Sequence, residues 1–182
     1  EKASEGGRYK EALSWYEKSL RLCGGNYECV SSNHNSIGVV YEAMDDDRKA
    51  FKHYEQALAA ARRINHRDLI ATNLFNTGAI YYRTFNQYDK ALALMQESER
   101  MFRQLGDRKS LAIVLFNEGK VYNAMGRYDK SLTLFNESLA LNRQAKNDQG
   151  IAVTLNLIGN AYAGLGRYDK PLAYYQEALA IN

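Results

Sequence analysis

The sequence predicts an all-α protein built from consecutive antiparallel helix pairs. Three observations carry this prediction: a motif that returns about every 40 residues, apolar residues that recur at three and four positions, and the absence of an alternating strand pattern. A single proline among 182 residues also argues against a many-turned β protein. The composition is rich in tyrosine, with 14 in the chain, and several of them recur at a fixed spacing.

Three markers in one phase define the repeat. The segment Gly126-Arg127-Tyr128-Asp129-Lys130 returns 40 residues later, beginning at Gly166. An aromatic residue or methionine is followed three positions on by a small residue, as in Phe135 and Ser138. A glycine is followed three positions on by a tyrosine, and these glycines are Gly38, Gly78, Gly119 and Gly159. The predicted repeats cover about 1–24 (partial), 25–64, 65–105, 106–145 and 146–182 (truncated), as a single array over 1–182.

Each period contains two helical patterns with a cap or a turn residue at their ends. Helices are expected at about 8–22, 27–43, 47–63, 67–84, 87–104, 108–125, 127–144, 148–165 and 167–181. Residues 3–7 resemble the tail of a preceding helix that ends at Gly7. Gly106 and Gly126 suit left-handed helix ends. The residues expected to cap the following helices with their side chains are Asn26, Asn65, Asp107 and Asn147-Asp148, and the Asp45–Asp47 run is interpreted as a capping, solvated turn.

The glycines inside the first helix of each pair indicate a close helix contact. Each costs about 1 kcal/mol relative to alanine in a helix interior, so a repeated glycine indicates a repeated contact. We expect the small residue of the second helix, Ala50, Ala91 or Ser131, to lie against this glycine face. Tyrosines are then expected to fill the wider gaps on either side.

The markers resemble the tetratricopeptide repeat. Its small, aromatic and small positions correspond here to Gly119, Tyr122, Ser131, Phe135 and Ser138. The resemblance implies a right-handed α-solenoid of stacked antiparallel helix pairs. The period of about 40 exceeds the usual 34, and the proline between repeats is missing, which resembles the extended subclass of kinesin light chains and bacterial peptide-pheromone receptors. Pro171 stands at a small-residue position and is tolerable only in the first turn of the last helix.

The resemblance also implies a concave groove lined by the first helices, which takes extended or helical peptides. On a helical wheel with Gly119 at zero, Ala112, Leu115 and Tyr122 form the inter-helix face, and residues at about +40° to +160° form a separate face. The predicted groove residues are Asn35, Phe75, Asn76, Tyr82, Arg83, Phe116, Asn117, Lys120, Asn123, Asn156 and Asn160.

The chemistry of this set suits a peptide ligand. A carboxamide donates and accepts at once, so a row of asparagines can pair with a peptide backbone. Phe75, Phe116 and Tyr82 would supply apolar pockets, and Lys120 and Arg83 could pair with a ligand carboxylate. The alternative is that the amides are solvated or bridge adjacent repeats, and that the two cations are solvated charges.

Composition and motifs restrict the remaining function classes. A net charge of +3 indicates neither a nucleic-acid nor a membrane partner. The three histidines lack metal-ligand spacing, and no phosphate loop or catalytic set can be assembled, so no metal, cofactor or enzymatic activity is expected. Cys23 and Cys29 flank a short turn and form either a disulfide or two buried thiols. The absence of an export signal indicates a cytoplasmic protein.

Three functions remain open on this evidence. The first is a non-catalytic module that binds a peptide or partner helix in the groove. The second is a structural module that self-associates end to end through uncapped apolar rows such as Leu172, Tyr175 and Leu179. In the third, the chain is the regulatory arm of a larger enzyme or transcription factor.

Overall fold

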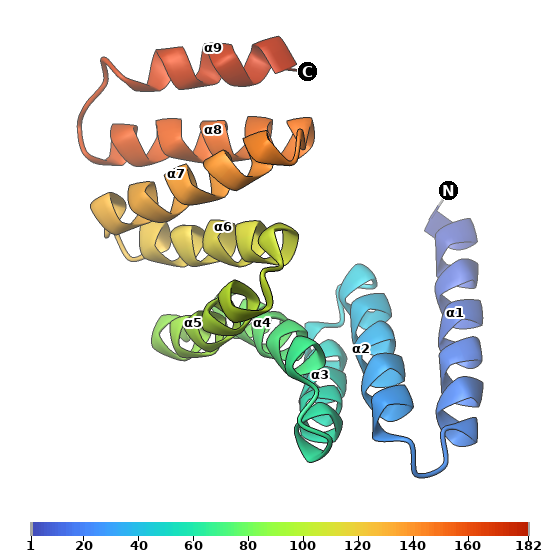
Figure 1. Cartoon of the computed structure of the whole chain (residues 1–182). Helices are drawn as coiled ribbons and strands as arrows, with labels where there is room; N and C mark the ends of the chain where they lie inside the picture. Colours follow the sequence, from blue (N-terminus) through green and yellow to red (C-terminus); the bar gives the residue numbers. More distant parts are fainter. Residues whose placement is uncertain (1, 182) are drawn as a thin grey trace. The chain divides into compact units, whose positions relative to one another are not determined.

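In the computed structural model, the described residues 2–181 form nine helices and no strand (Figure 1). They divide into an N-terminal unit that ends at Gln87 and a C-terminal unit that begins at Tyr88, and each is described by itself. The N-terminal unit contains α1 (Lys2–Leu22), α2 (Tyr27–Ala43), α3 (Asp47–Arg63) and α4 (Arg67–Arg83). The C-terminal unit contains α5 (Tyr88–Leu105), α6 (Arg108–Ala124), α7 (Tyr128–Gln144), α8 (Asp148–Gly164) and α9 (Pro171–Ile181).

The seven helices α2 to α8 lie within one residue of their predicted ends. The prediction for α1 was wrong, because the helix runs without interruption from Lys2 and Gly7 lies inside it. The last helix begins at Pro171 rather than at residue 167. Proline is therefore the first residue of α9, where a missing backbone N–H removes no hydrogen bond, as the sequence required.

In most turns between helices, a residue with a left-handed backbone conformation follows one helix and a capping residue precedes the next. Gly106 and Gly126 both have φ of +70°, as expected for the ends of α5 and α6. Asn65 does not cap α4 as predicted: it takes the left-handed position itself with φ of +51°, a conformation that asparagine tolerates. His66 caps α4 instead, with Nδ1 accepting from the Leu69 amide at 3.4 Å. Asp45, with φ of +58°, replaces the usual turn glycine after α2.

Within the N-terminal unit, each helix contacts the next in the chain, and α2 also contacts α4. Ala50, Tyr54 and Ile80 are fully buried, and the half-buried Phe51 and Phe85 pack against them. The two phenylalanine rings meet edge to face with centroids 5.3 Å apart. A disulfide joins Cys23 after α1 to Cys29 in the first turn of α2, so of the two alternatives for these cysteines the structure has the bridge.

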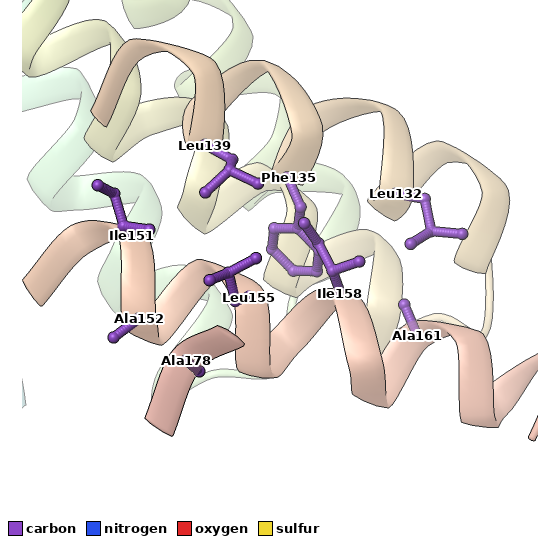
Figure 2. Packing of buried hydrophobic residues seen from close by; sticks show 9 residues of the cluster. All are labelled: Leu132, Phe135, Leu139, Ile151, Ala152, Leu155, Ile158, Ala161 and Ala178. Carbon is purple, nitrogen blue, oxygen red and sulfur yellow. The ribbon is translucent and has the colours of Figure 1, made fainter. Parts of the chain in front are cut away.

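Within the C-terminal unit, consecutive helices also contact one another, and α6 contacts α8. Figure 2 shows the apolar core between α7 and α8, where the Phe135 ring of α7 lies beside Leu155 and Ile158 of α8. Successive second helices are joined at the surface by ion pairs, Arg103 to Glu137 at 2.7 Å and Arg143 to Glu177.

The helix glycines accommodate aromatic rings. A Cβ added to Gly119 would lie 2.5 Å from Phe135, and one added to Gly159 would lie 2.5 Å from Tyr175. Gly38 is filled in the same way by Tyr54. The prediction that small residues of the second helix occupy this face was therefore wrong, because the aromatic side chain reaches across and leaves no room for a Cβ on the first helix.

Candidate partner-binding face

In the N-terminal unit, the predicted amides are hydrogen-bonded to each other. Asn76 Nδ2 of α4 donates to Asn35 Oδ1 of α2 at 2.8 Å, and both side chains are half-buried. This is the bridge between adjacent repeats that the sequence left open as an alternative. Phe75 and Tyr82 of α4 are also half-buried.

Arg83 is held by two carboxylates of the same unit. Its guanidinium donates to Glu42 at 2.8 Å and to Asp47 at 2.6 Å, and Thr84 also bonds Asp47. The bond from Arg83 is the main cause that lowers the pKa of Asp47 below its ordinary value. Glu42, Asp47 and Arg83, together with Val39, line a hollow of about 580 Å³. The Arg83 charge, which was expected to pair with a ligand carboxylate, is therefore paired with Glu42 and Asp47.

In the C-terminal unit, α6 and α8 present apolar side chains to solvent beside a hollow of about 310 Å³. Ile113 is 46% exposed and Val153 is 45% exposed, although both are aliphatic. They occupy equivalent positions, six residues before Gly119 and Gly159 respectively. Phe116 also lines the hollow and touches the core through Phe135, with ring centroids 5.9 Å apart.

Amide side chains complete this hollow. Asn117 Nδ2 donates to the Ile113 carbonyl at 2.8 Å, so one amide hydrogen and the carbonyl oxygen are left for other partners. Asn142 and Asn147, at the end of α7 and before α8, also line it, and Asn147 Nδ2 donates to Asn142 Oδ1 at 2.8 Å. Asn142 and Asn147 were not predicted, because they lie outside the first-helix face, and Gln149 and Thr154 of α8 were also missed. The concentration of amides around the α7–α8 turn was the available signal.

The remaining predicted residues of the C-terminal unit differ in their surroundings. The Lys120 ammonium lies 5.7 Å above the Phe116 ring. The Asn123 side-chain oxygen is buried and has no hydrogen-bond partner. Asn160 accepts a hydrogen bond from the Tyr175 hydroxyl at 2.7 Å, and Asn156 is exposed on α8. Phe116 and Asn117 are therefore the two predicted residues that share the hollow.

Among residues 2–181, no group of three or more His, Cys, Asp or Glu side chains is arranged to hold a metal ion. No helix in the same part of the chain combines the length and the apolar character needed to cross a bilayer.

The repeat geometry defines the class of protein. The tetratricopeptide repeat family matches residues 4–63, 30–104 and 110–182, so the chain belongs to this family. The comparison with curated protein sequences gives no significant match. Membership supports a protein-interaction module, a class that is typically non-catalytic.

Solved structures with similar coordinates have the same solenoid fold at low sequence identity. BtubC (BKLC) from P. vanneervenii is 19% identical with a TM-score of 0.87, over 98% of this chain and 74% of that one. A putative kinesin light chain from Podospora anserina is 13% identical with a TM-score of 0.76, over 97% and 87%. A Rap protein complexed with Competence and Sporulation Factor is 17% identical with a TM-score of 0.82, over 97% of this chain and half of that one. The extended-repeat resemblance is thereby confirmed for the fold.

Proposed function

We propose that the chain is a non-catalytic interaction module that holds a peptide or helix of a partner protein against its first-helix face. The observation that carries the proposal is the pair of exposed aliphatic side chains, Ile113 and Val153, beside an amide-lined hollow. Exposed apolar side chains grouped beside polar ones are typical of a surface that a partner covers. The Rap complex supports the class of ligand, since Competence and Sporulation Factor is bound to a protein of the same fold.

The face offers a ligand two kinds of contact, apolar packing and hydrogen bonds. Ile113, Val153 and Phe116 would take apolar side chains of the ligand. The amide of Asn117 has a hydrogen and an oxygen left to pair with the ligand backbone. Asn156 and Asn160 on α8 would extend the same row, and Lys120 would add a positive charge beside it.

The test is selection of binding peptides followed by matched variants. A displayed library of 12-residue peptides is selected on the wild-type chain, and the enriched peptides are titrated against Ile113→Asp/Val153→Asp and against Asn117→Ala/Asn156→Ala. All four positions are on the surface or half-buried, so the fold is expected to survive. We expect the aspartate pair to weaken binding at least tenfold and the alanine pair to weaken it less.

Leu179→Asp is the matched control. Leu179 is 73% exposed on α9 and lies outside the hollow, so the same change there should leave peptide affinity unchanged. If the selected peptides bind all three variants and the wild type equally, the first-helix face is not the binding surface and the proposal is wrong.

A second candidate is self-association through α9. Leu172 and Leu179 on this helix are 63% and 73% exposed. Exposed apolar side chains of this kind favour a face that a second copy covers. Sedimentation across a wide concentration range tests it. Growth of species larger than the monomer that is abolished by Leu172→Asp/Leu179→Asp supports this candidate, whereas a monomer at every concentration contradicts it.

A further inference from the structure

One core position of the C-terminal unit has an acidic residue where the other repeats do not. The residue before each helix glycine is Ile37, Thr77, Glu118 or Ile158, and all four are buried. Glu118 is only 1% exposed. Burying a carboxyl group at a position that accepts isoleucine lowers stability, so the packing of the repeat does not explain why this residue is acidic.

Glu118 lies at the inner end of a hollow of about 370 Å³ formed by α5, α6 and α7. The lining residues are Gln96, Glu99, Arg100, Glu118, Tyr122, Lys130, Thr133 and Leu134. None of them lines the hollow beside Ile113 and Val153. On the helical wheel, Glu118 lies about 100° from Gly119 in the direction away from the partner-binding face, so the two hollows occupy different sides of α6.

One oxygen of the Glu118 carboxyl group lacks a donor. Its Oε1 atom is buried and has no hydrogen-bond partner. Burial is the main cause that raises its pKa to about 8, and the negative charge of Glu99 raises it further. Glu137 of α7 acts in the same direction, whereas Arg100 and Arg103 of α5 lower the pKa.

The neighbouring charges are already engaged or exposed. Arg103 donates to Glu99 and to Glu137 at 2.7 Å each, so it is directed at those carboxylates. The Lys130 ammonium lies 5.5 Å from the Tyr122 ring, and Lys130 and Arg100 are exposed. Tyr122 is fixed by Gln96, whose Nε2 donates to its hydroxyl at 3.2 Å. The buried end of the hollow is therefore acidic, and its exposed edge is basic.

We propose that this hollow binds a single primary ammonium or guanidinium group that donates to the Glu118 carboxylate. A charged donor satisfies the unpartnered oxygen and offsets the cost of burying the carboxylate. The aliphatic stem of such a group would lie along Leu134 and Tyr122. Arg100 and Lys130 at the exposed edge disfavour a second positive charge and favour acidic groups on the rest of the ligand.

Two sources supply this chemistry, a small-molecule amine and a lysine or arginine side chain of a protein. The first probe is n-butylammonium chloride, titrated at constant ionic strength and followed by NMR of the isotope-labelled full chain. We expect saturable shifts at Glu118, Tyr122 and Thr133. The second probe is the peptide acetyl-Asp-Gly-Lys-Gly-Asp-amide, compared with the same peptide carrying acetyl-lysine.

The controls separate the charge of Glu118 from its shape. Glu118→Gln keeps the shape and should weaken butylammonium binding at least tenfold. Glu137→Gln, which removes a nearby carboxylate outside the hollow, should have little effect. n-Butanol has a similar size and no charge, and should not saturate the site.

The pH dependence is a further readout. The ligand needs an ionised carboxylate, and the ammonium remains charged up to about pH 10. Affinity should therefore rise about tenfold per pH unit up to about pH 8 and level off above it. A calorimetric titration at pH 6, 7, 8 and 9 measures this profile, and the same profile with Glu118→Gln should be flat.

The outcomes are distinguishable. Tighter binding of the lysine peptide than of butylammonium, lost on acetylation, supports a protein side chain as the ligand. Binding of butylammonium alone supports a small amine. Absence of saturation by both probes, equal binding by Glu118→Gln, or equal binding of n-butanol would overturn the proposal, whatever the result at Ile113 and Val153.

Discussion

The two units are built on the same helix pair but treat their first-helix faces differently. In the N-terminal unit, the polar side chains of this face bond one another, in the Asn35–Asn76 bridge and the Arg83 ion pairs with Glu42 and Asp47, and a single exposed aliphatic side chain, Val39, lies beside the ion pairs. In the C-terminal unit, Ile113 and Val153 stay exposed beside a hollow. The repeat therefore specifies the scaffold, and residues outside the repeat markers determine whether the polar groups of a face bond one another or are left for a partner.

The units also contain opposite kinds of ionisable group in their interiors. His34 and His53 of the N-terminal unit are half-buried and lie Nδ1 to Nδ1 at 3.0 Å. Glu118 of the C-terminal unit is buried and lacks a donor at one oxygen. A fall in pH should therefore destabilise the N-terminal unit, and a rise in pH should destabilise the C-terminal unit. Measuring stability against pH tests this difference.

The largest expected effect concerns what the units share, the contact of a glycine with an aromatic ring. Phe135→Ala should lower the free energy of unfolding by about 3–5 kcal/mol, since the ring is fully buried. Gly119→Ala should cost about 1–3 kcal/mol, because the added Cβ would lie 2.5 Å from that ring. Urea unfolding followed by circular dichroism measures both.

The double variant decides whether the two effects share a cause. In the Phe135→Ala background, Gly119→Ala should no longer destabilise and should gain up to about 1 kcal/mol from helix propensity. Additive losses in the double variant would show that the ring does not explain the helix glycine.

The second effect is the cost of the acidic residue that distinguishes the C-terminal unit. The pKa of Glu118 rises from an ordinary 4.5 to about 8 on folding, so its favourable contribution is complete below pH 4.5 and is lost as pH rises to about 8. Glu118→Ile, which copies Ile37 and Ile158, should stabilise the chain by on the order of 1–4 kcal/mol at pH 9 and by much less at pH 5. Thermal unfolding at both pH values checks the prediction, and equal gains at pH 5 and pH 9 would contradict it.

The third effect belongs to the histidine pair of the N-terminal unit. Burial lowers the pKa of both His34 and His53, and their mutual repulsion lowers that of His34 further, although Glu17 acts against the shift at His53. Because the pKa values are depressed, the unfolded chain binds more protons just below pH 6.5, and stability should fall as pH drops through this range.

Trp15 is the single tryptophan and lies in α1, so its fluorescence reports on the N-terminal unit. Unfolding followed by this signal should become easier from pH 7 to pH 5, and His53→Gln should remove most of the change. An unchanged pH profile in this variant would assign the acid sensitivity to other groups.

The smallest effect is expected at the exposed ion pairs. Arg103→Gln in the C-terminal unit should cost about 0.2–1 kcal/mol, because surface pairs are well screened by water. Arg83→Gln in the N-terminal unit should cost a similar amount. Urea unfolding measures both variants. A loss of more than about 2 kcal/mol in the free energy of unfolding for Arg83→Gln would contradict the prediction and show that its ion pairs with Glu42 and Asp47 are not weak surface pairs.

The fold was predictable because repeated features report on backbone and packing. Glycine phase, capping residues and helical periodicity placed α2 to α8 within one residue of their ends. The partner of the helix glycine was not predictable, because the wheel gives the face of a residue but not the reach of the side chain opposite. Gly119 therefore meets Phe135 rather than a small residue.

The candidate site was predictable only in part. Phe116 and Asn117 share the hollow, but Asn142 and Asn147 come from a turn that helical periodicity does not describe. The bridge between Asn35 and Asn76 could not be foreseen from one helix, because it depends on how two first helices approach each other. Glu118 was visible in the sequence as the acidic member of an Ile, Thr, Glu and Ile series, once the repeats were aligned.

The contrast between the two first-helix faces is tested most directly by the footprint of a selected peptide. A peptide that carries a spin label is added to the isotope-labelled chain, and the broadening of backbone NMR signals is measured. We expect the strongest broadening around Ile113, Asn117 and Val153, and little around Val39 and Glu42. Broadening concentrated around Val39 and Glu42, with none at Ile113 and Val153, would contradict the account.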